Sequence, residues 1–228
     1  MTEATHDNAA VRLQDIHAQI ASAAKLARRE AADIELIAVS KTRDAEAIRP
    51  LLEAGHRIFG ENRVQEAQAK WPRLRADFPE TRLHLIGQLQ SNKAEEAVAL
   101  FDYIHSLDRL SLAKALGKAM RDQARSLPCF IQVNIGEEQQ KGGCMVGDFP
   151  DLIAAAQDEG IEIAGLMCLP PADIEPAPYF ALLAELASRH SLSGLSMGMS
   201  DDFATAIMLG ATHVRVGTAL FGQRARTV

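Results

Sequence analysis

The sequence contains few cysteines and no long apolar run. Its 3 cysteines among 228 residues are widely spaced and form no C-x-x-C pair. Such an odd, scattered set predicts free thiols in a reducing compartment rather than a disulfide framework or a zinc site. No apolar run approaches the roughly 18 residues that a membrane span requires. Residues 1–10 are polar and lack the apolar core of a signal peptide. We therefore expect a cytoplasmic protein without a membrane partner.

An excess of basic residues is also missing. The chain carries 24 Lys and Arg against 30 Asp and Glu, a formal net charge of −6. Binding to nucleic acids or anionic membranes needs a basic face, so we expect neither as a partner. A local basic pocket for one phosphate is compatible with this charge. The content of 47% hydrophobic and 24% charged residues is typical of a globular protein.

Short β-rich runs alternate with helix-spaced segments along the chain. The predicted strands are residues 34–40, 57–59, 83–86, 103–105, 130–134, 162–167, 194–197 and 213–216. The predicted helices are residues 8–31, before the first strand, and 44–54, 62–75, 91–100, 108–124, 148–159, 175–189 and 200–209. Strict alternation implies right-handed crossovers and a parallel sheet. We predict the α/β class: a single (β/α)8 TIM-type barrel domain over residues 1–228, with an extra N-terminal helix that closes the outer ring.

Lys41 is the first residue that packing would not select. It follows the first predicted strand, and in such barrels the chemistry gathers at the C-terminal ends of the strands. A lysine at a strand end is usually a solvated surface group. The alternative is an amine in the barrel mouth, where desolvation and nearby positive charge favour the neutral form that attacks an aldehyde.

The loops after the seventh and eighth strands predict a phosphate site. Barrel phosphate sites often form there, with glycines that permit close approach and hydroxyl donors. Ser196, Ser200 and Thr218 supply hydroxyls, and Gly217 leaves room for the anion. Similar turns also occur without ligands. An aldehyde that carries a phosphate would match both this cradle and Lys41, and pyridoxal 5′-phosphate (PLP) is the candidate.

Arg215 and Asn62 constrain the chemistry further. Arg215 shares a strand face with Gly217, and a guanidinium near the pyridine nitrogen would disfavour its protonation and weaken PLP as an electron sink. The alternative is an outward Arg215 paired with an acid. Asn62 could contact the ring hydroxyl or the imine region, or cap a helix. His84 and His105 alternate with apolar neighbours, so we expect them to line the barrel rather than to catalyse.

Together these segments resemble the YggS/PROSC family of PLP homeostasis proteins, which have an alanine racemase-like barrel and no established catalytic reaction. The resemblance runs in matching order from about residue 34 to 222, in the segments AVSKT, FGEN, HLIGQLQSNK, IHSLDR, QVNIGEEQQKGG, GLMCLP, LSMGMSDD and VRVGTALFG. It implies that Lys41 is the PLP-linked lysine, as a covalent Schiff base. It also implies six further cofactor contacts, namely Asn62, Ser196, Met197, Arg215, Gly217 and Thr218.

Two functions compete. The first is a PLP carrier or buffer of intracellular PLP homeostasis that delivers PLP to apo-enzymes without turnover. The second is a PLP-dependent amino-acid racemase-like enzyme. Racemases of the related fold use a second domain and a tyrosine base, but only six residues follow Gly222, and neither Tyr103 nor Tyr179 is expected opposite Lys41. A Schiff-base aldolase without PLP would need a base beside Lys41 that the sequence does not indicate. We therefore favour the carrier, with no metal and as a monomer.

Overall fold

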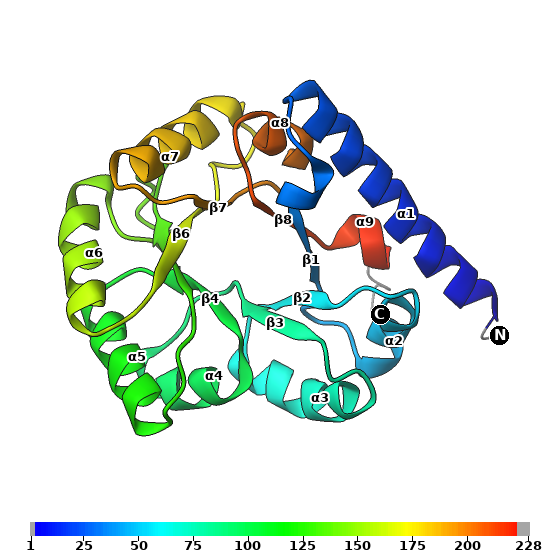
Figure 1. The fold of residues 1–228 in the computed structure, drawn as a ribbon, viewed down its shortest axis with the longest axis horizontal. Helices are drawn as coiled ribbons and strands as arrows, with labels where there is room; N and C mark the ends of the chain where they lie inside the picture. The colour runs from blue at the N-terminus through cyan, green and yellow to red at the C-terminus, as the bar shows by residue number, and fades with distance from the viewer. Residues whose placement is uncertain (1–2, 223–228) are drawn as a thin grey trace.

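Eight parallel strands close into a barrel in chain order (Figure 1). The computed structural model describes residues 3–222. Its strands are β1 (Glu35–Val39), β2 (Ile58–Glu61), β3 (Arg82–Leu85), β4 (Tyr103–Leu107), β5 (Cys129–Val133), β6 (Ile163–Cys168), β7 (Gly194–Ser196) and β8 (His213–Val216). Pairing of β1 with β8 completes the barrel. The predicted (β/α)8 barrel is therefore confirmed.

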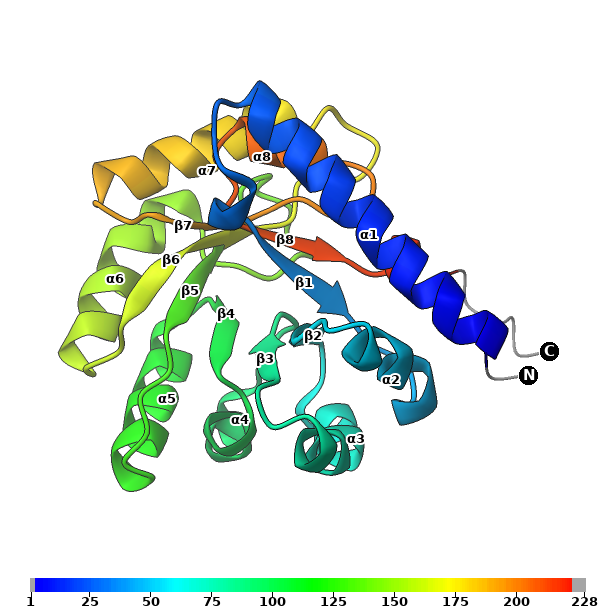
Figure 2. The ribbon, with the colours of Figure 1, turned by 45° about the vertical axis from the view of Figure 1, so that its right-hand side comes forward.

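Helices surround the barrel (Figures 1 and 2). They are α1 (Glu3–Leu26), α2 (Ala45–Glu53), α3 (Val64–Asp77), α4 (Ala94–Leu100), α5 (Leu110–Asp122), α6 (Phe149–Asp158), α7 (Ala177–Arg189), α8 (Phe203–Met208) and α9 (Thr218–Phe221). Short 3-10 turns span Ala31–Asp33, Ser91–Lys93 and Val146–Asp148. Within residues 3–222, no helix is long and apolar enough to cross a membrane.

The N-terminal helix completes the outer ring, as predicted. Figure 2 shows α1 lying along the side of the barrel, and α1 packs against α2, α8 and α9. The Arg29 guanidinium, beyond the end of α1, donates a hydrogen bond to the Ala211 carbonyl at 2.7 Å. The helix ends at Leu26 rather than at residue 31, because Arg28 adopts a left-handed conformation with φ of 57°. The short helix α9 was not predicted.

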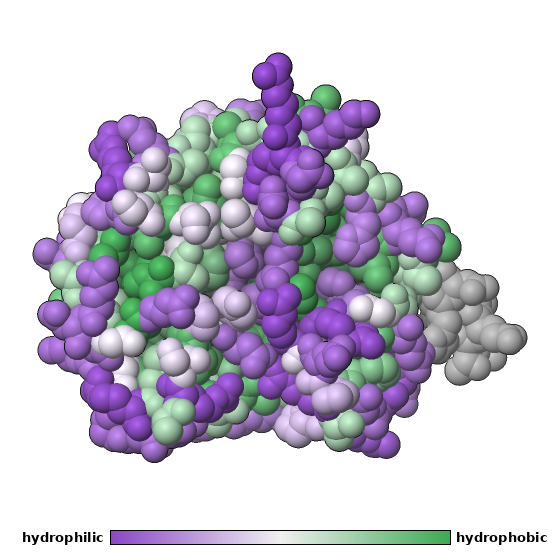
Figure 3. Space-filling view, viewed as in Figure 1, coloured by the Kyte–Doolittle hydropathy of each residue, from purple (hydrophilic) through white to green (hydrophobic). Residues whose placement is uncertain are grey.

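The core forms between the strands and the helix ring. All five residues of β5 are buried, as expected for a strand that packs on both faces. Three helices are followed by left-handed glycines that turn the chain toward the next strand: Gly55, Gly160 and Gly210. Asp44 caps α2, because its carboxylate accepts a hydrogen bond from the Ala47 amide at 2.8 Å. Figure 3 shows mainly hydrophilic residues around the rim of one barrel face.

Candidate functional site

A cavity of about 250 Å³ lies at the C-terminal ends of the strands. Parallel strands bring these ends to one rim, so side chains far apart in sequence meet there. Five of the seven predicted cofactor-binding residues line this cavity: Lys41, Asn62, Arg215, Gly217 and Thr218. The rest of the lining is Val39, Ile86, Leu169, Met199, Ser200 and Asp201.

Lys41 occupies the boundary between this cavity and a wider groove. It is half-buried, and it also lines an adjoining groove of about 750 Å³ together with Lys141, Asp173 and Asp201. Among residues 3–222, no side chain or backbone group forms a hydrogen bond or an ion pair with the Lys41 amine. The amine is therefore available to a molecule that enters from either side.

The loop that carries Lys41 is held by two side chains of α3. The Lys70 ammonium donates hydrogen bonds to the carbonyls of Ser40 and Arg43, both at 2.9 Å. The Glu66 carboxylate accepts one from the Thr42 amide at 2.5 Å. Thr42 is a β-branched residue with φ of 61°, a strained conformation that persists only where its surroundings impose it. Strain of this kind is typical of functional sites.

A buried ion pair supports this loop from below. Glu61 is fully buried, and its Oε1 lies 2.9 Å from the Lys70 ammonium. The same oxygen accepts hydrogen bonds from the Ser40 hydroxyl at 2.5 Å and from the Trp71 indole at 2.9 Å. Burial raises the pKa of Glu61, and Lys70 opposes that rise. Sequence reasoning missed this pair, because Glu61 in β2 and Lys70 in α3 share no local sequence pattern that marks them as partners.

Arg215 faces the barrel interior, which excludes the outward alternative. It is 4% exposed. Its Nη1 donates to the Ser196 hydroxyl at 2.7 Å, and its Nη2 donates to the Cys168 carbonyl at 2.9 Å. Desolvation lowers the pKa of Arg215, while the nearby Cys168 and Asp202 act in the opposite direction. Two fixed acceptors thus hold a buried cation at the cavity wall.

Ser196 and Met197 are not among the residues that line the cavity. Both are fully buried. The Ser196 hydroxyl accepts a hydrogen bond from Arg215, and Met197 packs in the hydrophobic core. The chain then turns at Gly198, whose φ is 92°, and presents Met199 and Ser200 to the cavity. In this segment Met199 and Ser200 therefore line the cavity, instead of the predicted Ser196 and Met197.

The cavity offers unpaired polar groups to a ligand. Asn62 Oδ1 is buried and has no hydrogen-bond partner among the described residues. The hydroxyls of Ser200 and Thr218 form no hydrogen bond within residues 3–222. A β-carbon at Gly87 would overlap the Asn62 backbone, so glycine is required for this placement. An amine, an amide, two hydroxyls and a guanidinium around a small cavity fit a phosphorylated aromatic aldehyde such as PLP.

Metal chemistry finds no support in the same region. Among the residues that the structure describes, no group of three or more His, Cys, Asp or Glu side chains could hold a metal ion. The three cysteines are buried, and burial raises the pKa of each thiol to about 12. Such thiols are poor nucleophiles at neutral pH. The reactive candidate in the cavity is therefore the Lys41 amine.

The sequence matches known proteins over most of its length. Residues 11–225 match the family model described as alanine racemase, N-terminal domain. The pyridoxal phosphate homeostasis protein of Pseudomonas aeruginosa is 42% identical over 215 residues, which cover 92% of this chain and 93% of that protein. The pyridoxal phosphate homeostasis protein of Escherichia coli K12 is 37% identical over 223 residues, which cover 93% and 95%.

The chain is also similar to solved structures. PipY of Synechococcus elongatus with PLP bound is 40% identical, with a TM-score of 0.74 over 89% of this chain and 100% of that one. PipY without PLP gives a TM-score of 0.80 over 93% of this chain and 99% of that one, at 39% identity. An alanine racemase of Clostridium difficile is 17% identical, with a TM-score of 0.69 over 97% of this chain and 58% of that one, and shares the fold.

Proposed function

The chain belongs to the family of pyridoxal phosphate homeostasis proteins, and we propose that it binds PLP in the cavity beside Lys41 and serves intracellular PLP homeostasis. One observation carries the proposal. A free lysine amine lies at the rim of a small cavity with unpaired polar groups, in a chain 40% identical to a protein solved with PLP bound. PLP contributes an aldehyde that condenses reversibly with a primary amine.

Each lining residue has a role in this proposal. Lys41 would supply the amine that condenses with the PLP aldehyde, with release of one water. Thr218, Ser200 and the backbone at Gly217 would bind the phosphate, since the loops after β7 and β8 are the usual phosphate site of such barrels. Asn62 accepts a hydrogen bond through its unpaired Oδ1. Arg215 at the cavity wall would disfavour protonation of a pyridine nitrogen bound near it.

The residues that line the cavity favour a protein that binds and releases PLP over an enzyme that uses PLP to convert amino acids. A buried cation beside the ring weakens the electron sink that amino-acid chemistry on PLP requires. The lining of the cavity includes no tyrosine or histidine that could act as an opposing base. Tyr103 stacks on His84 at the other end of the barrel, and Tyr179 packs against the core in α7. We propose a cytoplasmic, monomeric, single-domain carrier that lacks turnover.

Release of PLP follows from the position of Lys41. Its amine borders both the cavity and the wider groove, so an incoming amine could exchange with it without unfolding of the barrel. The lysine of an apo PLP-dependent enzyme is such an amine. The proposed partners are therefore apo-enzymes that accept PLP by exchange.

A transfer assay tests this function. The PLP-loaded protein is freed of unbound cofactor and mixed with an apo-aminotransferase, and recovered activity is followed over time. We expect a visible absorption band in the loaded protein and recovery of the aminotransferase. Lys41→Ala should lose both, whereas Lys118→Ala on the exposed face of α5 should retain them. Retention of the band without any transfer would contradict the carrier, and turnover of an amino acid by the loaded protein would favour the racemase-like alternative.

A further inference from the structure

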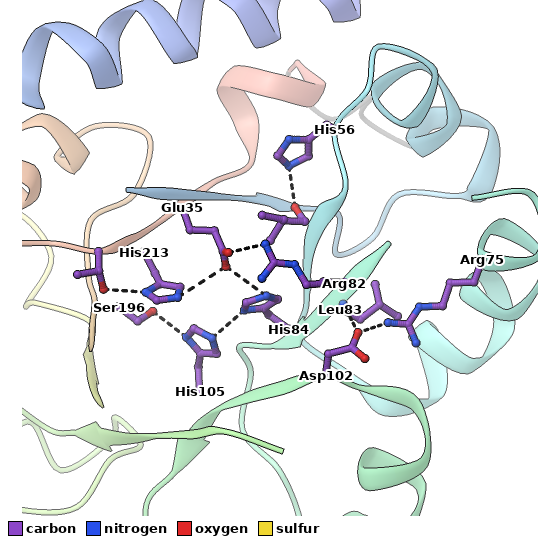
Figure 4. Close-up of polar contacts among 12 residues, drawn as sticks. Glu35, His56, Arg75, Arg82, Leu83, His84, Asp102, His105, Ser196 and His213 are labelled. Atoms are coloured by element: carbon purple, nitrogen blue, oxygen red, sulfur yellow. Dashed lines mark hydrogen bonds and ion pairs between the residues drawn. The ribbon is translucent and has the colours of Figure 1, made fainter. Parts of the chain in front are cut away.

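A chain of polar side chains runs through the barrel interior from the cavity to the opposite end. It begins at Arg215 and ends at Glu35, the first residue of β1 (Figure 4 shows the chain from Ser196 to Glu35). The successive distances are 2.7 Å from Arg215 Nη1 to Ser196 Oγ, 2.8 Å from Ser196 Oγ to His105 Nδ1, and 2.9 Å from His105 Nε2 to His84 Nδ1.

The last contact joins His84 Nε2 to Glu35 Oε1, an oxygen that His213 Nε2 also approaches, at 3.6 Å. His84 Nε2 lies 3.4 Å from Glu35 Oε1. Both atoms are buried, and neither forms a hydrogen bond with the described residues. Buried polar atoms in folded proteins are paired, and a carboxylate oxygen can only accept. The two atoms therefore complement each other only when His84 carries its hydrogen on Nε2.

This condition sets which group donates and which accepts in every hydrogen bond from Arg215 to Glu35. A guanidinium only donates hydrogen bonds, and a neutral imidazole donates with one nitrogen and accepts with the other. If His84 donates to Glu35, then His105 donates to His84, and the Ser196 hydroxyl donates to His105. The reverse direction places the His84 lone pair against the carboxylate. The Ser196 oxygen could accept from two N–H donors through its two lone pairs, so the contact at Glu35 is the one that decides the direction.

Burial and stacked aromatic rings surround His84 and His105 and keep both imidazoles neutral. Burial holds the pKa of His84 and His105 well below 6.5, and neighbouring positive groups add to the effect. The Tyr103 ring stacks on His84 and the Phe130 ring stacks on His105, with centroids 4.5 and 4.2 Å apart. The charged and titratable groups that face Glu35 are Arg82 at 2.7 Å, His84, and His213 at 3.6 Å.

We propose that Glu35 is a positioning residue for the cofactor cavity and acts through His84, His105 and Ser196 to orient Arg215. The inference rests on the proposed function, because it assigns Arg215 to the PLP ring. A hydroxyl that donates to His105 is a better acceptor for the guanidinium, since hydrogen bonds in a chain polarise one another. The carboxylate at the start of β1 thereby selects one arrangement of the groups that hold Arg215.

The wild-type protein itself provides the first test. Multiple-bond 15N–1H correlation spectra of the histidine rings report which nitrogen carries the hydrogen, and they are recorded on cofactor-free protein at pH 7.5. We expect the hydrogen on Nε2 of both His84 and His105. A hydrogen on Nδ1 of either ring would overturn the inference. This readout does not depend on PLP.

Two variants provide the second test. Glu35→Leu should give His84 a second tautomer, shift the absorption band of bound PLP and weaken PLP binding by about three- to tenfold, the effect of one lost hydrogen bond. Glu162→Leu removes an exposed carboxylate that directly precedes β6 at the same end of the barrel. Glu162 is not part of the series of side chains from Arg215 to Glu35, so this variant should have wild-type tautomers and wild-type PLP affinity. Wild-type tautomers and affinity in Glu35→Leu would refute the inference.

Ser196→Ala keeps the test decisive if Glu35→Leu does not fold. It should weaken PLP binding to a similar extent while His84 keeps its hydrogen on Nε2, because Glu35 still accepts it. Unchanged affinity in Ser196→Ala would overturn the proposal. A wild-type protein that binds no PLP would refute the proposed function, whereas a PLP-binding protein with the opposite tautomers would refute only this inference.

Discussion

Replacement of Lys70 by methionine should destabilise the protein strongly and loosen the loop that carries Lys41. Lys70 is 8% exposed and its partner Glu61 is fully buried, so Lys70→Met leaves an uncompensated buried carboxylate. Loss of one partner of a buried pair costs about 3–5 kcal/mol. We expect about 3 kcal/mol, since the Ser40 hydroxyl and Trp71 indole still donate to Glu61.

Urea unfolding followed by the fluorescence of Trp71, the single tryptophan, measures this change beside the pair itself. Lys118→Met is the control, because Lys118 pairs with Asp122 on the surface and its loss should leave the midpoint unchanged. The double variant Lys70→Met, Glu61→Leu should recover much of the loss, because no charge is then left unpaired. A Lys70→Met protein within about 1 kcal/mol of wild type would refute the reasoning.

The pH dependence of this variant has a definite sign. Burial raises the pKa of Glu61 in the folded state, and removal of Lys70 raises it further. A carboxyl with a raised folded-state pKa favours folding while it is protonated, and this contribution is lost as the pH rises through that pKa. The stability deficit of Lys70→Met should therefore be smaller at pH 5 than at pH 8.

Three further predictions concern other buried groups. Burial lowers the pKa of His56 and His213 to about 4; their stabilising contribution, present above pH 6.5, should fall by about 3 kcal/mol each as the pH drops toward 4. Urea unfolding at both pH values measures the fall, and His56→Gln should reduce it. Gly87→Ala should weaken PLP binding and lower the free energy of unfolding by about 1–3 kcal/mol, because the added β-carbon meets the Asn62 backbone. Gly147→Ala is the control: its β-carbon meets nothing within 4 Å, so PLP binding and stability should not change. All three thiols should resist alkylation in the native protein and react in urea, as mass spectrometry would report.

The sequence predicts the barrel well, because its signals are local. Alternating β-rich and helix-spaced runs identify the eight strands, and glycines such as Gly55 and Gly160 mark helix ends through their left-handed conformation. The rule that chemistry gathers at strand ends was enough to place Lys41, Asn62 and Arg215 beside one cavity. A four-residue helix such as α9 is too short to show a helical period.

The remaining features depend on tertiary contacts that a sequence pattern does not record. Ser196 ends β7 with its side chain bonded inside the barrel, Met197 packs in the hydrophobic core, and the left-handed Gly198 precedes Met199 and Ser200, which line the cavity. A lysine in an amphipathic helix usually lies on the surface, so nothing in the sequence distinguishes the buried Lys70 from exposed ones. The direction of the hydrogen-bonded chain below Arg215 requires atomic distances.

Borohydride reduction of the PLP-treated protein tests the central claim most directly. Reduction fixes a lysine Schiff base as a stable adduct, and peptide mass spectrometry then locates it. We expect one adduct on Lys41, absent from Lys41→Ala and unchanged in Lys118→Ala. An adduct on another lysine, or no adduct in the wild-type protein, would contradict the assignment of this cavity to PLP.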